Sequence, residues 1–96
     1  MQVKVRFFTS LREIVGKREE TLSFQGEEKI TVDAVLKSLK EKYGKPFHDY
    51  VYNSGTAEPK GFLQFLVNGN STTLTRLQTE LRDGDVLAIL PPVGGG

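Results

Sequence analysis

The sequence predicts a two-layer α+β domain, in which a mixed sheet of about five strands is covered on one face by one main helix. Three observations support this fold class. Apolar and polar residues alternate at the beginning of the chain, apolar residues recur at helical spacing in the first half, and the last strand segment is apolar on both faces. The 96 residues are enough for one domain with a modest core.

The first two predicted strands are joined by a short helix. Alternation over the first seven residues indicates a strand with one buried face. That face consists of Val3, Val5 and Phe7. Ser10 and Glu13 have the spacing of a capping box, and Gly16 can supply the left-handed end of a short helix. Alternation resumes at residues 20–24, which predicts the second strand.

The main helix is expected at residues 32–43. Its apolar residues share one face at a spacing of about 3.6 residues. They are Val32, Val35, Leu36, Leu39 and Tyr43. Thr31 is a good N-cap, and Asp33 places a negative charge in the first turn, where the helix dipole favours it. Gly44 ends the helix.

The second half of the chain supplies the remaining strands. Residues 45–61 form a connection whose aromatic side chains allow part of it to fold back as a helical turn. A strand is expected at residues 62–67, and the turn signal Asn68-Gly69 joins it to a short polar strand near residues 72–74.

The last strand is expected at residues 86–90, after an Asp-Gly-Asp turn at residues 83–85. Its residues are apolar on both faces, which is typical of a central strand. Placing it beside the first strand accounts for the apolar content of both. This order is the β-grasp arrangement, so we expect a β-grasp domain over residues 1–90 and an extended tail over residues 91–96.

The composition excludes several classes of function. The chain has no cysteine, which excludes a disulfide framework, a thiolate nucleophile and cysteine-ligated zinc. A single histidine, His48, excludes a histidine-rich metal site, so we expect no metal. The net charge of +1 argues against nucleic acid as a partner. No apolar run approaches the roughly 20 residues of a membrane span, and no signal peptide is recognisable. We therefore expect a cytoplasmic domain.

The tail carries the chemistry that this composition allows. It consists of Pro91, Pro92, Val93, Gly94, Gly95 and Gly96. The prolines end the last strand, and glycines without a Cβ can pass a narrow channel and leave the Gly96 carboxylate unhindered. ATP in a partner enzyme can activate that carboxylate as an acyl-adenylate, which sulfur, a thiol or an amine then attacks. The alternative is a frayed end, but a proline stem directly after a core strand favours function.

The chain resembles the MoaD family over its whole length. The resemblance is carried by the tail, by V-N-G at 67–69, by L-x-D-G-D at 81–85 and by V-R-F-F-x-x-L-R-E-I-V-G at 5–16. MoaD proteins are the small, ubiquitin-like subunits of molybdopterin synthase. The long aromatic connection at residues 45–61 leaves open a MoaD-like paralogue with another task.

The resemblance implies a sulfur carrier that is not an enzyme alone and binds no cofactor itself. A MoeB-like adenylating enzyme would activate the Gly96 carboxylate with ATP, and a sulfur-transfer protein would convert it to a thiocarboxylate. The tail, with Val93, Gly94 and Gly95, would then enter a MoaE-like large subunit. There the sulfur would pass to cyclic pyranopterin monophosphate in molybdopterin synthesis for the molybdenum or tungsten cofactor. The family implies a hetero-oligomer in the synthase.

Candidate partner contacts lie beside the tail. Phe8 falls on the polar face of the first strand, and Leu90 has the parity of the face that the helix leaves open. If the two strands are adjacent, these side chains form an exposed apolar patch, unless the connection at residues 45–61 covers it. MoaD proteins dock both MoaE and MoeB through this face, so the resemblance supports contacts by Phe8, Leu90 and the adjoining Pro91 and Pro92.

Arg12 is a further candidate contact. It can pair with an acidic side chain of a partner near the tail, although a solvated helix charge is the commoner role for such a residue. His48 has no second histidine or cysteine with which to share a metal. We expect it at the surface or packed in a loop.

Three other functions remain open on the sequence alone. The chain can serve a different product, such as the thiazole of thiamine or thiolated tRNA. It can also be a ubiquitin-like modifier that is joined through Gly96 to lysines of other proteins. A plain interaction domain with an inert tail is the third alternative, and it predicts that removal of Gly95 and Gly96 changes nothing.

Overall fold

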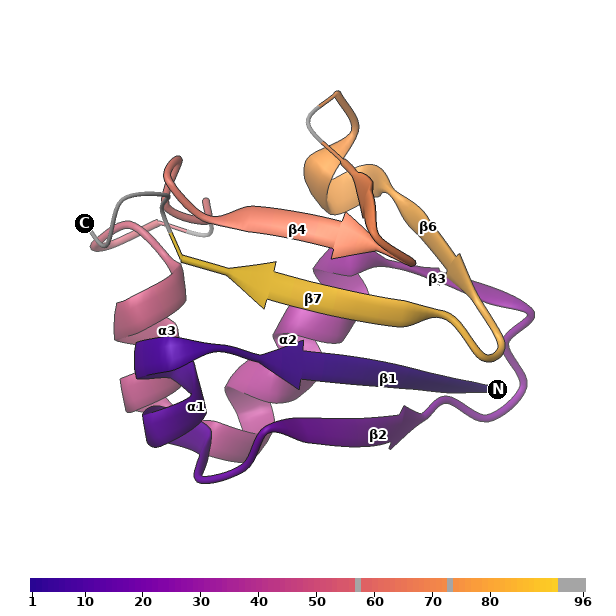
Figure 1. Cartoon of the computed structure of the whole chain (residues 1–96), viewed down its shortest axis with the longest axis horizontal. Helices are drawn as coiled ribbons and strands as arrows, with labels where there is room; N and C mark the ends of the chain where they lie inside the picture. The colour runs from indigo at the N-terminus through magenta and orange to yellow at the C-terminus, as the bar shows by residue number, and fades with distance from the viewer. Residues whose placement is uncertain (57, 73, 92–96) are drawn as a thin grey trace.

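The computed structural model describes residues 1–56, 58–72 and 74–91. Most of these residues belong to regular elements joined by short turns (Figure 1). In chain order the elements are β1 (Gln2–Phe7), α1 (Thr9–Val15), β2 (Glu19–Ser23), β3 (Lys29–Thr31), α2 (Val32–Tyr43), α3 (Lys45–Val51), β4 (Gln64–Val67), β5 (Asn70–Ser71), the 3-10 helix η1 (Arg76–Gln78), β6 (Glu80–Arg82) and β7 (Val86–Leu90).

The main sheet has five strands in the order β2-β1-β7-β4-β5. The first and last strands, β1 and β7, pair in parallel at its centre, and the other neighbours are antiparallel. This is the mixed sheet that the sequence predicts, with the adjacency expected from the apolar content of both strands. A second sheet, formed by β3 and β6, was not predicted.

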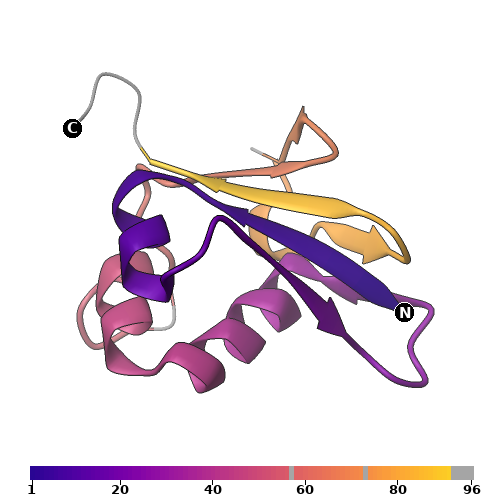
Figure 2. The ribbon, with the colours of Figure 1, turned by 60° about the horizontal axis from the view of Figure 1, so that its bottom comes forward.

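The helices lie on one side of the main sheet and leave the other side open. Figures 1 and 2 show α2 crossing behind the sheet, with α1 and α3 at the end towards which β7 runs. The buried side chains of α2 occupy the predicted face: Val32, Val35, Leu36 and Leu39. Thr31 is its N-cap, as predicted, because its Oγ1 accepts a hydrogen bond of 3.2 Å from the Ala34 amide.

The predicted capping box of the first helix is wrong. α1 begins one residue before Ser10, and its N-cap is Phe8, whose side chain makes no capping hydrogen bond. Phe8 continues the extended backbone of β1, and its carbonyl accepts hydrogen bonds from the amides of Leu11 and Arg12. The chain therefore turns at Thr9, which has a φ of 46°. Gly16 ends the helix in the left-handed conformation, as predicted.

Most predictions for the second half are confirmed: the last strand is β7, at residues 86–90 as expected, and the strand expected at residues 62–67 is β4, which begins two residues later. Part of the predicted connection folds back as the helix α3. The short strand expected near residues 72–74 lies instead at β5, because Asn68 and Gly69 both have positive φ and form a two-residue turn. β5 therefore pairs with β4 directly after the turn. Thr72 follows β5 with a buried side chain, whose hydroxyl donates a 2.6 Å hydrogen bond to the Phe65 carbonyl.

Candidate functional site

The central strand β7 positions the start of the tail. Its neighbours are β1 and β4, with Ile89 opposite Phe7 and Leu90 opposite Gln64. Pro91 follows directly and is half-buried at the end of the sheet. We call Leu90 and Pro91 the root of the tail. Because β7 is paired with a strand on each side, the position of this root relative to the body of the domain is fixed. The predictions for Pro92, Val93, Gly94, Gly95 and Gly96 fall outside the described residues.

The open face beside this root has an apolar strip. In β7 the side chains of Leu87 and Ile89 are buried against the helices, as their parity predicts. The residues of the opposite parity, together with the facing residue of β4, are half-buried. They are Val86, Ala88, Leu90 and Leu66.

A charged strip runs next to the apolar one. Lys4 and Arg6 of β1 lie on the open face opposite Val86 and Ala88. Both are near the exposed Glu19 of β2, at 3.7 Å and 4.0 Å between charged atoms. Exposed pairs at such distances contribute little to stability. These side chains therefore remain available to a partner that covers the sheet.

Phe8 and Leu90 occupy corresponding places in this arrangement. Each is the residue directly after the last pair of the parallel ladder, Phe7 and Ile89. Both are half-buried, and the guanidinium carbon of Arg6 lies 5.9 Å from the centre of the Phe8 ring. The structure thus places both at the root of the tail, where the sequence predicts partner contacts.

The side chain of Arg12 has no hydrogen-bond or ion-pair partner among the described residues. It lies half-buried on α1, at the same end of the molecule as the root, and its Nε is buried with no hydrogen-bond acceptor. Desolvating a guanidinium donor without an acceptor is unfavourable. An acidic group from outside the chain would relieve this, and the contact predicted for Arg12 stays a prediction.

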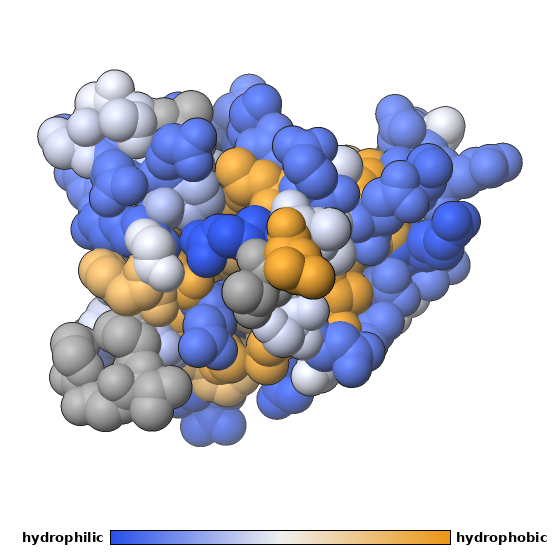
Figure 3. Space-filling model, turned by 90° about the horizontal axis from the view of Figure 1, so that it is seen from above, coloured by the Kyte–Doolittle hydropathy of each residue, from blue (hydrophilic) through white to orange (hydrophobic). Residues whose placement is uncertain are grey.

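Sequence reasoning missed Phe62, which is 50% exposed. It lies two residues before Gln64, the residue opposite Leu90, so it sits at the end of the sheet where the tail begins. Its parity with Leu66 in the strand predicted at residues 62–67 was the available signal, although Phe62 itself lies in the turn before β4. Viewed from the side of β4 and η1, hydrophobic side chains interrupt a largely hydrophilic surface (Figure 3).

His48 lies half-buried on the helix α3 and not in a loop, where the sequence analysis placed it. Its ring stacks on Tyr52 with 5.2 Å between centroids, and its Nδ1 lies 3.4 Å from a carboxylate oxygen of Asp49. Within the described part of the chain, no three histidine, aspartate or glutamate side chains gather to hold a metal ion. No helix there is long and apolar enough to span a bilayer.

A family model described as the ThiS family matches residues 5–96. The chain belongs to the ThiS family. The match runs from β1 through the tail, so it covers the root, the open face and the glycines together. Members of this group are ubiquitin-like sulfur carriers or modifiers, which act as small carrier proteins rather than as catalytic enzymes.

Individual relatives are similar over the whole chain. The small archaeal modifier protein 3 of Haloferax volcanii is 33% identical over 101 residues, covering 100% of both chains. The solution structure of the small archaeal modifier protein 1 from Methanosarcina acetivorans is 38% identical with a TM-score of 0.78, covering 99% of this chain and 96% of that one. The putative molybdopterin converting factor, subunit 1, from Pyrococcus furiosus is 28% identical with a TM-score of 0.74, covering 97% and 99%.

These similarities confirm the β-grasp fold. They also place the MoaD resemblance within the broader ThiS family, in which named modifiers and a putative molybdopterin converting factor are similar to the same chain. The shared features are the β-grasp body and a carrier or modifier role.

Proposed function

We propose that this ThiS-family protein is a sulfur carrier whose Gly96 carboxylate is activated by a partner enzyme. The observation that carries the proposal is the family match over residues 5–96, which joins the described β-grasp body to the glycine tail. A carboxylate oxygen of Gly96 attacks the α-phosphorus of ATP and releases pyrophosphate. Hydrosulfide supplied by a sulfur-transfer protein then attacks the acyl carbon, and AMP leaves. The product is a thiocarboxylate.

The body of the domain serves this chemistry as a docking platform. The strip of Val86, Ala88, Leu90 and Leu66 offers apolar area, and Arg12 offers an unpaired guanidinium at the same end. A partner that covers the strip receives the tail at a defined place, because β7 holds the root between two strands. In this proposal Phe8, Pro91 and Pro92 belong to the same contact.

We assign the sulfur to molybdopterin synthesis. The similarity to a putative molybdopterin converting factor subunit supports this assignment, as do the tail and the residues that resemble MoaD. The partners are then a MoeB-like adenylating enzyme and a MoaE-like large subunit, with which the chain forms a hetero-oligomer. The acceptor of the sulfur is cyclic pyranopterin monophosphate.

The assignment can be tested with the thiocarboxylate form of the protein. The protein is mixed with a MoaE-like subunit and cyclic pyranopterin monophosphate, and the pterin product is analysed by mass spectrometry. We expect a dithiolene product, and none from the carboxylate form. A stable thiocarboxylate that leaves the pterin unchanged, while a MoaD protein converts it, would contradict this product. Thiazole and tRNA would then be tested as the remaining acceptors.

A second candidate function is protein modification through the same tail. The observation that favours it is the full-length similarity to small archaeal modifier protein 3. Here a lysine amine attacks the activated carbon of Gly96, AMP leaves, and an isopeptide bond forms. Purification of a tagged chain under denaturing conditions, followed by peptide mass spectrometry, distinguishes this function. Lysines carrying the Gly96 remnant, missing when the chain lacks Gly96, would identify a modifier.

A further inference from the structure

A hollow of about 790 Å³ opens beside α2 and α3. Figure 2 shows these helices on the side of the main sheet away from its open face. The hollow is bounded by the end of α2, by α3 and by the segment that follows α3. Its main lining side chains are Lys40, Lys45, His48, Asp49, Tyr52 and Lys60. This volume is within the range of small-molecule sites in proteins. The predicted tail chemistry makes no use of this region.

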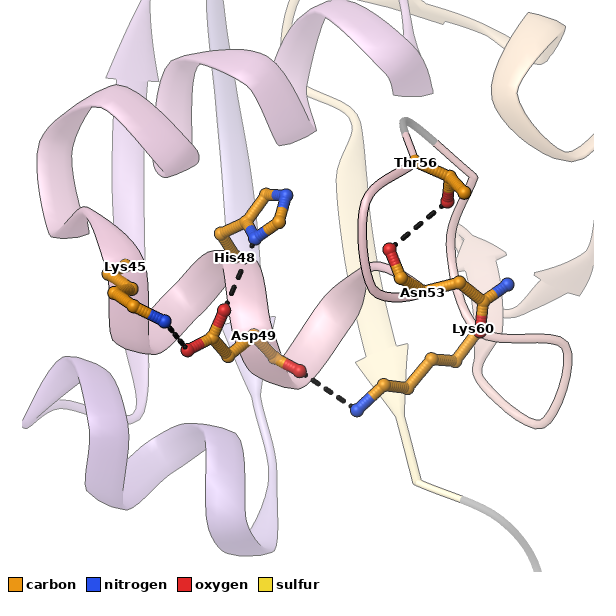
Figure 4. Close-up of polar contacts among 6 residues, drawn as sticks. All are labelled: Lys45, His48, Asp49, Asn53, Thr56 and Lys60. Atoms are coloured by element: carbon orange, nitrogen blue, oxygen red, sulfur yellow. Dashed lines mark hydrogen bonds and ion pairs between the residues drawn. The ribbon is translucent and has the colours of Figure 1, made fainter.

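The side chains around the hollow are held by contacts with one another. Figure 4 shows Lys45 and His48 both directed at the carboxylate of Asp49, while Lys60 reaches the main-chain oxygen of the same residue. The Lys45 ion pair measures 2.6 Å and the Lys60 hydrogen bond 2.8 Å. Asp49 thus anchors the two lysines from opposite directions, one on α3 and one on the segment beyond it.

The hollow is electropositive although the whole chain has a net charge of only +1. Among the described residues that line it, three lysines face one aspartate, which leaves +2 with His48 neutral. Lys40 makes no ion pair with any described residue, and its Nζ lies 5.7 Å from the centre of the Tyr52 ring. At least one ammonium group is therefore free to bind an external anion.

A stacked aromatic pair adds a planar wall. Tyr52 is only 3% exposed, and the His48 ring lies on it at an angle of 25°. The opposite wall is a turn in which the Thr56 hydroxyl donates to the Asn53 carbonyl at 3.1 Å, with Ser54 and Gly55 facing the hollow (Figure 4). Cations, a planar ring and small turn residues therefore meet around one space.

We propose that this hollow binds a small phosphate-bearing molecule, with Lys40 and Lys45 as the principal phosphate contacts. Ammonium groups bind phosphate as point charges, with charge-assisted hydrogen bonds to its oxygens. The lysines come from three separate segments and surround a hollow, whereas an acidic peptide would be matched by cations along an open groove. The phosphate can be free, or part of a nucleotide whose base stacks on His48. The proposal is independent of Gly96.

The test uses the isotope-labelled full chain and two probes, pyrophosphate and ATP, at constant ionic strength. Amide shifts are followed by NMR. We expect saturable shifts confined to residues 40–60, with a Kd of about 1 mM or tighter. A larger response to ATP, with shifts at His48, would identify a nucleotide. An equal response to both probes would identify the phosphate groups alone, and either result supports the site.

Matched variants decide the role of the lysines. K40Q/K45Q removes two exposed charges at the hollow, and we expect binding to weaken about tenfold or more. K29Q/K37Q removes two exposed charges elsewhere and is expected to bind as the wild type does. Equal weakening in both variants, shifts spread over all lysines, or the same shifts from sodium sulfate would overturn the proposal. So would saturation by a glutamate-rich peptide without any response to the phosphate probes.

Discussion

At the scale of single residues, Glu20 shows how the chain uses a buried charge. It lies on the inner face of β2, and its carboxylate accepts hydrogen bonds from Lys42 and Tyr43 of α2. Lys17 completes the set at 3.2 Å. Burial raises the pKa of Glu20, but the hydrogen bonds from Lys42, Tyr43 and Lys17 outweigh it and lower that pKa below 4.5. The network fastens the edge strand β2 to the main helix.

Replacing Glu20 is therefore expected to cost stability. We expect Glu20→Gln to lower the free energy of unfolding by about 1–3 kcal/mol, because three donors lose a charged acceptor. Glu19→Gln removes the neighbouring exposed carboxylate as a control and should change it by less than about 0.5 kcal/mol. Urea unfolding at neutral pH measures both. Equal effects of the two variants would contradict the role of the network.

The same carboxylate predicts a pH dependence. A folded pKa below the unfolded value means that the ionised form stabilises the fold fully above pH 4.5. This contribution is lost as the pH falls through the lowered folded pKa. The stability difference between wild type and Glu20→Gln should therefore shrink in acid, as measured by urea unfolding at a series of pH values. If the stability difference between wild type and Glu20→Gln grew on acidification, the pKa of Glu20 would be raised in the folded state, which contradicts the prediction.

At the scale of elements, local signals determine most of the fold. The α2 face and the Thr31 cap were predictable because both depend on residues within a few positions. The register of β5 follows from the conformation of Asn68 and Gly69, which the turn signal indicates although the predicted strand was placed too late. Asn68 also connects this turn to the start of β7. Its side-chain amide donates a 3.0 Å hydrogen bond to the Asp85 carboxylate, and its side-chain oxygen accepts one of 2.9 Å from the Val86 amide.

The turn between β4 and β5 gives a direct test at this scale. Gly69 has a φ of 83°, so Gly69→Ala forces an L-residue into the left-handed region and should cost about 1 kcal/mol. Gly61 has no such φ and no neighbour within 4 Å of an added Cβ. Gly61→Ala is therefore the matched control and should be close to neutral. Thermal unfolding of both variants checks the difference.

Capping of the main helix can be tested in the same way. Thr31→Ala removes the acceptor for the Ala34 amide and should lower stability by about 1 kcal/mol, whereas Thr31→Ser retains it. Chemical denaturation distinguishes the two. If the serine variant were as unstable as the alanine variant, packing of the threonine methyl group rather than capping would explain the loss.

At the scale of the whole molecule, sequence reasoning finds the architecture and misses the contacts that join distant segments. The pairing of β1 with β7 was predictable because both strands are rich in apolar residues. The β3–β6 sheet escaped prediction because three-residue strands carry almost no periodic signal. The hollow beside α3 could not be predicted from the sequence either, because its lysines lie on three segments that only the tertiary fold brings together.

The separation of body and tail is a whole-molecule prediction. The buried hydrophobic core extends from Val3 to Ile89. Removal of residues 92–96 is therefore expected to leave the unfolding temperature unchanged within about 1–2 °C, since it deletes no core contact among the described residues. Thermal unfolding followed by circular dichroism measures this. A substantial loss of stability would show that the tail also has a structural role.

The most direct test of the account is the mass of the tail after activation. The protein is incubated with a MoeB-like adenylating enzyme, ATP and a sulfur source, next to a control chain that lacks Gly96. We predict that one oxygen is exchanged for one sulfur at Gly96 and that the control remains unchanged. An unaltered C-terminal peptide, with an enzyme that converts its own carrier under the same conditions, would contradict the sulfur-carrier function for that activation system.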